Sequence, residues 1–357
     1  MRWMVVAGGT GGHIMPGLAL AEALLEKGRE VVFVAGSRPI EKRILKDKPF
    51  PVYHLEVEGF VGRSLPRKII ALFKLGLAFL RSLQLIKHLN PQIIFAEGGY
   101  VSIPVVLAGK LLGKRLGLHE QNAIPGVANK LLSRFVDRVF ISFPESKDYF
   151  PKDKVVFSGN FVRRSLFKKK EDKKEDVCLL ILGGSLGARF INELSLEVLP
   201  RLLEEFPNLR VIWQTGLDDY ERVKKRFNEE AFGGRVKILP FIDDMGSVYS
   251  EADFVLSRAG ASTIAELCAL AIPALFIPFP YATHNHQEKN AKALVEAGCA
   301  FMLRQSEATP ERALSLLRSA LSQKELRVKM GRAMRKFFDP QGLERAIAEM
   351  EALVERR

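Results

Sequence analysis

Two glycine-rich turns, each placed between a short apolar run and a helical pattern, constrain this chain more than any other feature. The first turn spans residues 8–12 and follows the apolar run 3–7, and the second spans 183–187 and follows 178–182. A buried strand that leads through glycines into a helix N-terminus suits phosphate binding, because glycine lets the backbone approach and free N–H groups favour an anion. The repeat predicts two similar domains that bind a phosphate-bearing ligand.

Apolar, strand-like runs alternate with helical patterns in both halves, which predicts parallel sheets covered on both faces. A length of 357 residues fits two domains of ordinary size. We therefore expect two Rossmann-like, doubly wound domains that face a cleft. The first covers residues 1–162, joined by a C-terminal helix at 340–357, and the second covers 163–339. The charged run 168–176 is interpreted as a solvated linker, and the first helix is expected at 16–27.

The net charge of +13 predicts an acidic partner: a nucleic acid, an anionic membrane or a phosphorylated substrate. Residues 59–96 contain no Asp or Glu, and their Lys and Arg residues alternate with apolar ones. Because Lys74, Arg81 and Lys87 interrupt the apolar run, we expect an amphipathic helix on an anionic bilayer and not a spanning helix. The alternative is a core helix with a basic, solvated face. No nucleic-acid-binding motif is present, so nucleic acid is not expected.

Three cysteines lie in apolar stretches without paired spacing, which indicates buried thiols in a reducing compartment. The chain begins directly on a predicted strand, so we expect no secretory signal and a cytoplasmic location. His284 and His286 have no third ligand at a diagnostic spacing, so no metal is expected.

The first glycine turn differs from the dinucleotide-binding fingerprint. Ile14 stands where the third glycine belongs, and no acidic residue ends the second strand. Arg38 at that place would suit a 2′-phosphate, which leaves an NADP enzyme as an alternative. His13 is either a polar group at the start of a helix or a general base, because an ordinary histidine pKa near ~6.5 suits proton removal at neutral pH.

Polar loops follow further strands at 97–102, 119–122 and 257–266, and open α/β sheets bind ligands at such strand ends. Glu266 either complements the dipole of its own helix or accepts hydrogen bonds from a ribose diol. Each loop alone would be ordinary.

The motifs occur in one order: GGTGGH at 8–13, GGY at 98–100, HEQN at 119–122, GGSLGAR at 183–189, FIDDM at 241–245 and GASTIAE at 260–266. This combination closely resembles the MurG family of bacterial N-acetylglucosaminyltransferases, and the resemblance covers nearly the whole chain. It implies the GT-B fold and an inverting transferase without a cofactor. The implied reaction moves N-acetylglucosamine (GlcNAc) from UDP-GlcNAc to the 4-hydroxyl of the N-acetylmuramic acid (MurNAc) of lipid I. The product is lipid II, a precursor of cell-wall peptidoglycan.

The resemblance also implies roles for particular residues, with His13 as the candidate general base. The donor would be bound by Thr10, Gly11, Gly12, Asn122, Arg163, Ser185, Ile242, Ala261, Ser262, Thr263, Glu266 and Gln287. The acceptor diphosphate would meet Gly8, Gly9, Gly98, Gly99 and Tyr100. The undecaprenyl tail of lipid I implies an enzyme that is peripheral on the cytoplasmic face of the inner membrane. The residues implied to face the membrane are Lys68, Phe73, Lys74, Phe79 and Arg81.

Three positions depart from the family pattern: Leu186 where glutamine is usual, Phe161 where proline is usual, and His286 in place of the first glutamine of a pair. Two rival functions share the donor site. A UDP-GlcNAc 2-epimerase would need no lipid, and a non-catalytic nucleotide-sugar-binding protein would show no turnover.

Overall fold

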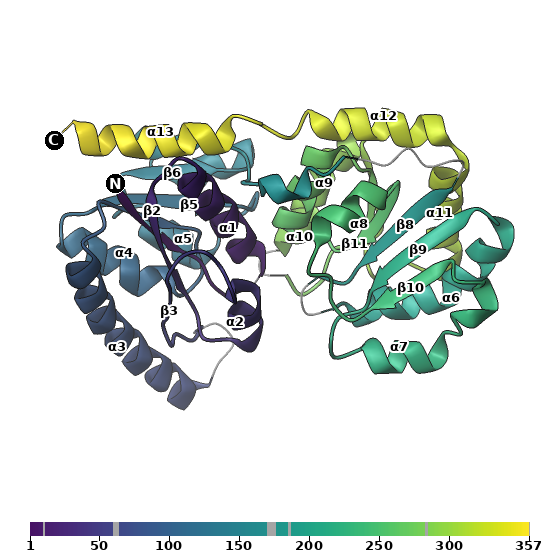
Figure 1. Cartoon of the computed structure of the whole chain (residues 1–357), viewed down its shortest axis with the longest axis horizontal. Coiled ribbons are helices and arrows are strands. Elements are labelled where there is room, and N and C mark those ends of the chain that lie inside the picture. The colour runs from purple at the N-terminus through teal and green to yellow at the C-terminus, as the bar shows by residue number, and fades with distance from the viewer. Residues whose placement is uncertain (10, 60–63, 170–175, 185–186, 283–284, 357) are drawn as a thin grey trace. The chain divides into compact units, whose positions relative to one another are not determined.

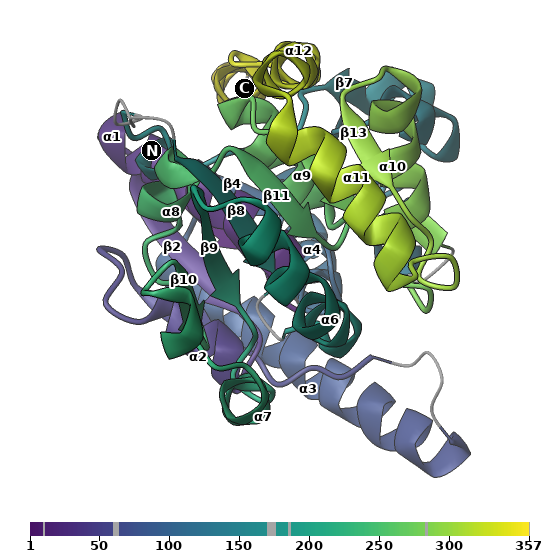
Figure 2. The same cartoon turned by 90° about the vertical axis from the view of Figure 1, so that its right-hand side faces the viewer.

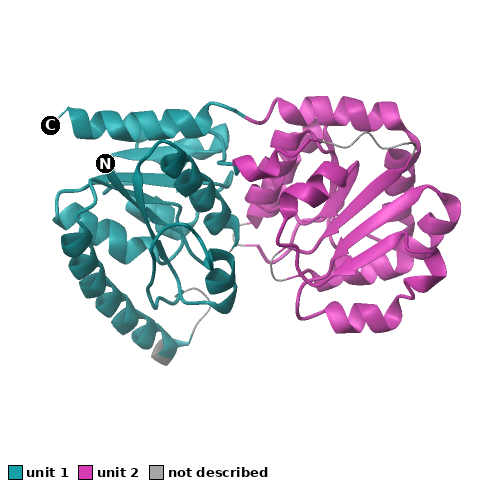
Figure 3. Cartoon of the chain, viewed as in Figure 1, with its two compact units in different colours: residues 1–163, 339–357 teal, residues 164–338 magenta. Residues whose placement is uncertain are grey.

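The computed structural model describes residues 1–9, 11–59, 64–169, 176–184, 187–282 and 285–356. The chain forms two compact units (Figure 3). Unit 1 comprises Met1–Arg163 and Asp339–Arg357, and unit 2 comprises Arg164–Phe338.

Unit 1 is built on a parallel sheet of seven strands among the described residues, in the order β3-β2-β1-β4-β5-β6-β7 (Figure 1). Its strands are β1 (Arg2–Val6), β2 (Glu30–Ala35), β3 (Val52–His54), β4 (Ile93–Ala96), β5 (Arg115–Glu120), β6 (Arg138–Ile141) and β7 (Val155–Phe157). Its α-helices are α1 (Gly11–Glu26), α2 (Pro39–Leu45), α3 (Leu65–Leu89), α4 (Ser102–Leu111), α5 (Val127–Leu132) and α13 (Gly342–Glu355). Short 3₁₀ helices span Pro144–Tyr149 and Lys152–Lys154.

Helices cover both faces of this sheet, as the predicted alternation requires. Alternate residues of β1 explain the two layers, since successive side chains of a strand point to opposite faces. Trp3 and Val5 pack with α1 and α13 on one face, whereas Met4 and Val6 pack with α3 and α4 on the other. The core of unit 1 therefore consists of two apolar layers separated by the sheet.

Unit 2 has a second parallel sheet, of six strands in the described part of the chain, in the order β10-β9-β8-β11-β12-β13. Its strands are β8 (Val177–Leu182), β9 (Leu209–Gln214), β10 (Val236–Leu239), β11 (Phe254–Ser257), β12 (Ala274–Phe276) and β13 (Ala300–Met302). Its α-helices are α6 (Arg189–Glu205), α7 (Tyr220–Arg226), α8 (Met245–Glu251), α9 (Ala261–Leu270), α10 (His286–Glu296), α11 (Pro310–Ser322) and α12 (Lys324–Arg335). The 3₁₀ helices Arg164–Leu166 and Glu230–Phe232 complete the unit.

Helices α6 and α11 pack against each other and share the large apolar core of unit 2, and α9 packs against α12 (Figures 1 and 2). The predicted linker 168–176 lies partly outside the described residues. Lys168, however, forms an ion pair with Asp244 at 2.6 Å, so this end of the charged run is attached to unit 2. The ion pair and two hydrogen bonds from Ser247 lower the pKa of Asp244 to about 2.

Helix α1 begins at Gly11, five residues before the predicted start, and Pro16 lies inside it. The prediction followed the preference of proline for a first helical position and the low helix propensity of glycine. Packing against β1 overrides both preferences, because Ile14 is fully buried in the core of unit 1. As a result His13 lies in the first turn of the helix.

Helix α3 carries the basic, apolar segment. By length and composition Arg67–Leu89 is long and apolar enough to cross a membrane, with a mean hydropathy of 1.8 in its most apolar window. The segment is thus more apolar than Lys74, Arg81 and Lys87 led us to predict. One side of the helix nevertheless packs on unit 1 through Ala71, Ala78, Ser82 and Ile86, which are buried.

The other side of α3 exposes large apolar side chains: Ile69, Ile70, Leu72, Phe73, Leu77 and Leu80. Of the five residues expected to face a membrane, Lys68, Phe73 and Arg81 are exposed. Lys74 pairs with Glu58, and Phe79 packs partly against the core of unit 1. These two residues are therefore less available to a membrane than expected.

Candidate active site

The strand order of unit 1 reverses direction between β1 and β4, so the loops after these two neighbouring strands lie at the carboxyl edge of the sheet, where open α/β sheets bind ligands. Gly99 allows the loops to approach closely. Its φ is +77°, and a Cβ there would lie 2.4 Å from the Gly8 carbonyl oxygen and 3.5 Å from His13 Cδ2. The structure thus brings together the predicted turns 8–13 and 98–100, apart from Thr10, which lies outside the described residues.

A buried carboxylate holds the first glycine turn. Glu41 of α2 accepts hydrogen bonds from the backbone N–H groups of Gly9 and, at 3.0 Å, Arg38. The Arg38 guanidinium donates to the Gly9 carbonyl oxygen at 2.6 Å. The N–H of Gly9, expected to meet the acceptor diphosphate, is therefore occupied by Glu41. Arg38, considered above as a ligand of a 2′-phosphate, supports the turn.

His13 is half-buried and contacts the loop after β5. Its Nδ1 lies 2.9 Å from Oε1 of Gln121, a buried residue of the HEQN motif. The structure therefore joins the candidate base to a loop more than a hundred residues away in the sequence. No local pattern identifies Gln121 as its partner.

Glu120 fixes the loop that carries Asn122, a predicted donor contact. Its Oε1 accepts hydrogen bonds from the backbone and side-chain N–H groups of Asn122, at 2.9 and 3.1 Å. Its Oε2 accepts from the Gly126 N–H at 3.2 Å and from Asn129 Nδ2 at 2.9 Å. Sequence reasoning gave Glu120 no role, because its partners became apparent only in the fold.

Phe161, one of the departures from the family pattern, stacks on the ring of His119 with centroids 4.1 Å apart. Two positions later, Arg163 is the last residue of the first segment of unit 1, Met1–Arg163. Its charge acts on Glu22 of α1, whose pKa is raised by burial and lowered in part by the guanidinium. Arg163 is thus placed beside α1.

In unit 2 the strand order reverses between β8 and β11, and the loops after them lead to α6 and α9. The first of these loops requires its glycines. A Cβ on Gly183 would lie 2.7 Å from the Ala188 nitrogen, and one on Gly187, whose φ is +82°, would lie 2.5 Å from the Thr215 carbonyl oxygen. Ser185 is one of the residues predicted to bind the donor, and Leu186 is one of the departures from the family pattern. Both lie outside the described residues.

The second loop of unit 2 places Ala261, Ser262 and Thr263 in the first turn of α9. Glu266 follows in the same helix and is buried, and its Oε2 accepts a hydrogen bond from Tyr249 Oη at 2.8 Å. Tyr249 was missed in the sequence because it lies on another helix, α8, without a motif of its own. Ile242, also buried, precedes α8.

Arg258 organises the loop after β12. Its guanidinium donates to the carbonyl oxygens of Ile277 and Pro278, at 3.0 and 3.1 Å. Burial lowers the pKa of Arg258 to about 10, so it stays charged at neutral pH. In the same loop the Phe279 N–H donates to Gln287 Oε1 at 2.9 Å. Gln287, which is predicted to contact the sugar, therefore holds the backbone of this loop.

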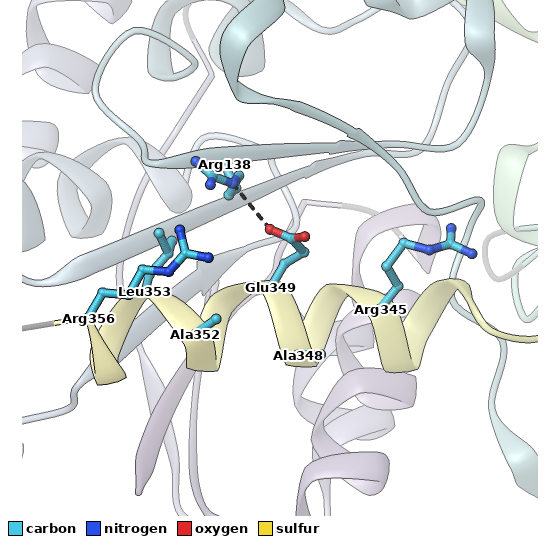
Figure 4. A pocket seen from close by; sticks show the side chains of 7 residues that line it. All are labelled: Arg138, Arg345, Ala348, Glu349, Ala352, Leu353 and Arg356. Atoms are coloured by element: carbon cyan, nitrogen blue, oxygen red, sulfur yellow. Dashed lines mark hydrogen bonds and ion pairs between the residues drawn. The ribbon is translucent and has the colours of Figure 1, made fainter.

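His286 is the first residue of α10, and its neighbour His284 lies outside the described residues. Within the described ranges, no three side chains of His, Cys, Asp or Glu gather as metal ligands. A cavity of about 280 Å³ lies elsewhere in unit 1 (Figure 4). Arg138 at the first residue of β6 lines it, together with α13 residues, so this cavity is at the amino end of its strand and away from the loops described above.

Comparison with protein families assigns both halves of the chain. Residues 3–141 match the glycosyltransferase family 28 N-terminal domain, and residues 178–346 match the glycosyltransferase family 28 C-terminal domain. The chain belongs to glycosyltransferase family 28.

Two curated relatives of this family 28 chain share one name, UDP-N-acetylglucosamine–N-acetylmuramyl-(pentapeptide) pyrophosphoryl-undecaprenol N-acetylglucosamine transferase. The protein from Myxococcus xanthus is 41% identical over 330 residues, which cover 91% of this chain and 86% of the relative. The protein from Thermodesulfovibrio yellowstonii is 37% identical over the whole of both chains. The predicted resemblance to the MurG family is thereby confirmed.

Solved structures confirm the predicted GT-B fold class. The crystal structure of Acinetobacter baumannii MurG matches with a TM-score of 0.75 and 32% identity, over 98% of this chain and 99% of that one. A putative UDP-N-acetylglucosamine 2-epimerase from Listeria monocytogenes matches with a TM-score of 0.72 and 16% identity, over 99% and 97%. At 16% identity, the similarity to the epimerase structure shows a shared fold alone.

Proposed function

We propose that this family 28 glycosyltransferase moves GlcNAc from UDP-GlcNAc to lipid I and so forms lipid II for peptidoglycan synthesis. One observation carries the proposal: relatives named for this transfer match nearly the whole chain at 37–41% identity. The loops at the switch points of the two sheets support the proposal, because open α/β sheets bind ligands at such places.

Unit 2 binds the donor in this proposal. Glu266, held by Tyr249, accepts hydrogen bonds from the ribose hydroxyls, and the backbone of Ile242 meets the uracil ring. The N-terminus of α6 and the glycine turn before it face the diphosphate, where N–H groups and the helix dipole favour negative charge. Ser185 adds a hydrogen bond, and Ala261 and Gln287 contact the sugar.

Unit 1 binds the acceptor, whose diphosphate approaches the turns at 8–9 and 98–100, where Glu41 already occupies the Gly9 N–H. His13 takes the proton from the 4-hydroxyl of MurNAc as that oxygen attacks the anomeric carbon of the donor. The attack inverts the configuration from α to β, and UDP leaves with its charge met by helix N-termini and Ser185. No resident cofactor takes part in these steps.

Lipid I stays in the bilayer through its undecaprenyl chain, so the enzyme has to work at the cytoplasmic surface of the inner membrane. We infer that α3 docks there as an amphipathic helix. Its exposed apolar side, which includes Phe73, enters the headgroup region, while Lys68 and Arg81 meet anionic lipids. The buried side of α3 keeps the helix on unit 1, which favours lying on the membrane over spanning it.

The test is transfer of labelled GlcNAc from UDP-GlcNAc to a lipid I analogue in detergent, with EDTA present. We expect a β-linked disaccharide on the lipid. Tight UDP-GlcNAc binding without transfer, also after Mg²⁺ is added back, would contradict the proposal and favour a nucleotide-sugar-binding protein. Conversion of UDP-GlcNAc to its 2-epimer would favour an epimerase.

A further inference from the structure

Glu97 is a buried carboxylate that the proposed reaction does not use. It directly follows β4, and its side chain is 0% exposed. Its Oε2 lies 2.7 Å from His119 Nδ1 and accepts a hydrogen bond from Gln121 Nε2 at 2.8 Å. Among the described residues, Oε1 has no hydrogen-bond partner. Burying a carboxyl group is costly, so its presence beside the candidate base calls for an explanation.

The contacts of Gln121 determine which way its amide points. Nε2 lies 2.8 Å from Oε2 of Glu97 and 2.8 Å from the Glu97 backbone carbonyl oxygen. A carbonyl oxygen only accepts hydrogen bonds, so the group that faces it has to be the amide NH₂. The carbonyl end of the amide, Oε1, therefore faces His13 Nδ1 at 2.9 Å.

Because Gln121 Oε1 can only accept, His13 Nδ1 has to donate. From this we infer that Gln121, oriented by Glu97, is a positioning residue that holds neutral His13 in its Nδ1–H tautomer. The lone pair of the ring then lies on Nε2, where it can take the acceptor proton. This inference rests on the proposed function, in which His13 is the base.

The same contact serves His13 before and after proton transfer. In the neutral ring and in the imidazolium, Nδ1–H donates to Gln121 Oε1, so the network does not rearrange when Nε2 gains the proton. Groups that need no reorganisation during the reaction are the ones that lower a barrier most effectively. A fixed amide thus plays the orienting part that a carboxylate plays for other catalytic histidines.

His119 explains how Glu97 is tolerated in the core. Its Nδ1 faces Glu97 Oε2, and its Nε2 lies 3.2 Å from the Gly159 carbonyl oxygen and 3.1 Å from Ser142 Oγ. The Gly159 carbonyl oxygen can only accept, so Nε2 has to donate to it, and a hydrogen bond between Oε2 and Nδ1 then needs one further proton, which leaves the buried pair neutral as a whole. Such a pair can orient Gln121 without placing a net charge beside the phosphates of the substrates.

The first test reads the tautomer directly. The full chain is labelled with ¹⁵N-histidine, and the signals of His13 among the six histidines are assigned by their loss in His13→Gln. Ring ¹⁵N shifts and couplings should show Nδ1 protonated and Nε2 unprotonated in the neutral form. In Gln121→Met, which keeps the side-chain length but offers no acceptor, the Nε2–H form should appear. A wild-type His13 protonated at Nε2 would overturn the inference.

The second test is kinetic. Gln121→Met should lower kcat by about 100-fold, the scale of general-base assistance, and leave the KM for UDP-GlcNAc unchanged. Glu97→Met should have a smaller effect, because Gln121 keeps the backbone carbonyl as one acceptor. The double variant should be no slower than Gln121→Met alone if Glu97 acts through Gln121. Losses that multiply in the double variant would refute this coupling.

Ser146→Ala is the matched control. Ser146 is also buried in unit 1, and its Oγ donates one hydrogen bond, to the Phe143 carbonyl oxygen at 2.7 Å. Ser146→Ala should keep the wild-type tautomer and kcat.

The NMR measurement needs no turnover, so it separates the claim about the tautomer from the claim about the proposed function. An Nδ1–H tautomer without transfer would contradict the proposed function alone, and transfer with an Nε2–H tautomer would contradict this inference alone.

Discussion

Gly99 and Gly28 show how the same backbone conformation has different consequences at different places. Both have a positive φ, +77° and +70°. At Gly99 a Cβ would meet the Gly8 carbonyl oxygen and the His13 ring, whereas at Gly28 nothing lies within 4 Å. A side chain at either position would be strained, because the backbone is in the left-handed region. At Gly99 it would also displace parts of the candidate site.

We therefore predict that Gly99→Ala and Gly28→Ala both lower the free energy of unfolding by about 1 kcal/mol or more, through left-handed strain. Gly99→Ala should in addition lose most transferase turnover, because the Gly8 carbonyl and His13 have to move. Urea unfolding and kcat measure the two effects. Equal turnover in the two variants would show that the close approach does not matter for activity.

The buried cysteines make the free energy of unfolding depend on pH. Burial raises the pKa of the Cys299 thiol to about 11 and also raises that of Cys268. An unfolded thiol ionises near ~8.5, so deprotonation favours the unfolded chain. The stabilising contribution is complete below that pH and is lost as the pH rises towards 11. Cys299→Ala should therefore show a shallower decline of the unfolding free energy than wild type, and parallel declines would contradict this assignment.

Sequence reasoning found the residues that lie in motifs and missed those that support them. His13, the glycines of both turns and Glu266 lie at strand ends or within the first two turns of helices, which local patterns can identify. Glu41 binds the first turn from 32 residues away, and Tyr249 reaches Glu266 from another helix. Such partners depend on how the strands are ordered in the sheet, which no short window of sequence contains.

At the scale of elements, the strands and most helices were predictable because their apolar periods are local. The start of α1 was not, because Gly11 and Gly12 have poor helix propensity and only packing makes them helical. The periodicity of α3 predicted a long amphipathic helix. It did not predict that Phe79 turns towards the core or that Lys74 pairs with Glu58, since both depend on neighbouring elements.

The exposed side of α3 leads to a prediction about membrane binding. Phe73 is 76% exposed, and transferring a phenylalanine side chain from water into an apolar phase is worth about 1.5–3 kcal/mol. Phe73→Asp should therefore weaken binding to phosphatidylglycerol-containing vesicles by about tenfold or more. Its kcat with a water-soluble acceptor should not change.

Val328→Asp is the control for this experiment, because Val328 is also exposed but lies on α12 of unit 2. It should bind vesicles as the wild type does. Vesicle binding that is equally strong in Phe73→Asp and wild type would exclude this side of α3 as the docking surface.

At the scale of the whole molecule, the chain leaves unit 1 after Arg163 and returns to it at Asp339. The returning helix α13 buries Ala346, Ile347 and Met350 in the same core as β1 and α1. An ion pair between Arg29 and Glu351, at 2.7 Å, joins α13 to the segment after α1. The C-terminal helix is therefore a structural part of unit 1.

Gly342, the first residue of α13, tests this attachment. A Cβ there would lie 1.6 Å from the Ser158 carbonyl oxygen, so Gly342→Ala should destabilise unit 1 by about 1–3 kcal/mol or more. Gly76→Ala, in an open position within α3, should instead stabilise the chain by up to about 1 kcal/mol. Urea unfolding compares the two variants. An unchanged free energy of unfolding in Gly342→Ala would mean that α13 is not held at this point.

The central claim is that His13 in unit 1 activates the acceptor while unit 2 binds the donor. Its most direct test is the turnover of His13→Ala with UDP-GlcNAc and a lipid I analogue, measured beside calorimetric binding of UDP-GlcNAc. We predict wild-type affinity for the donor and a loss of most turnover, about 100-fold or more. Unchanged turnover would contradict the claim and remove His13 as the base.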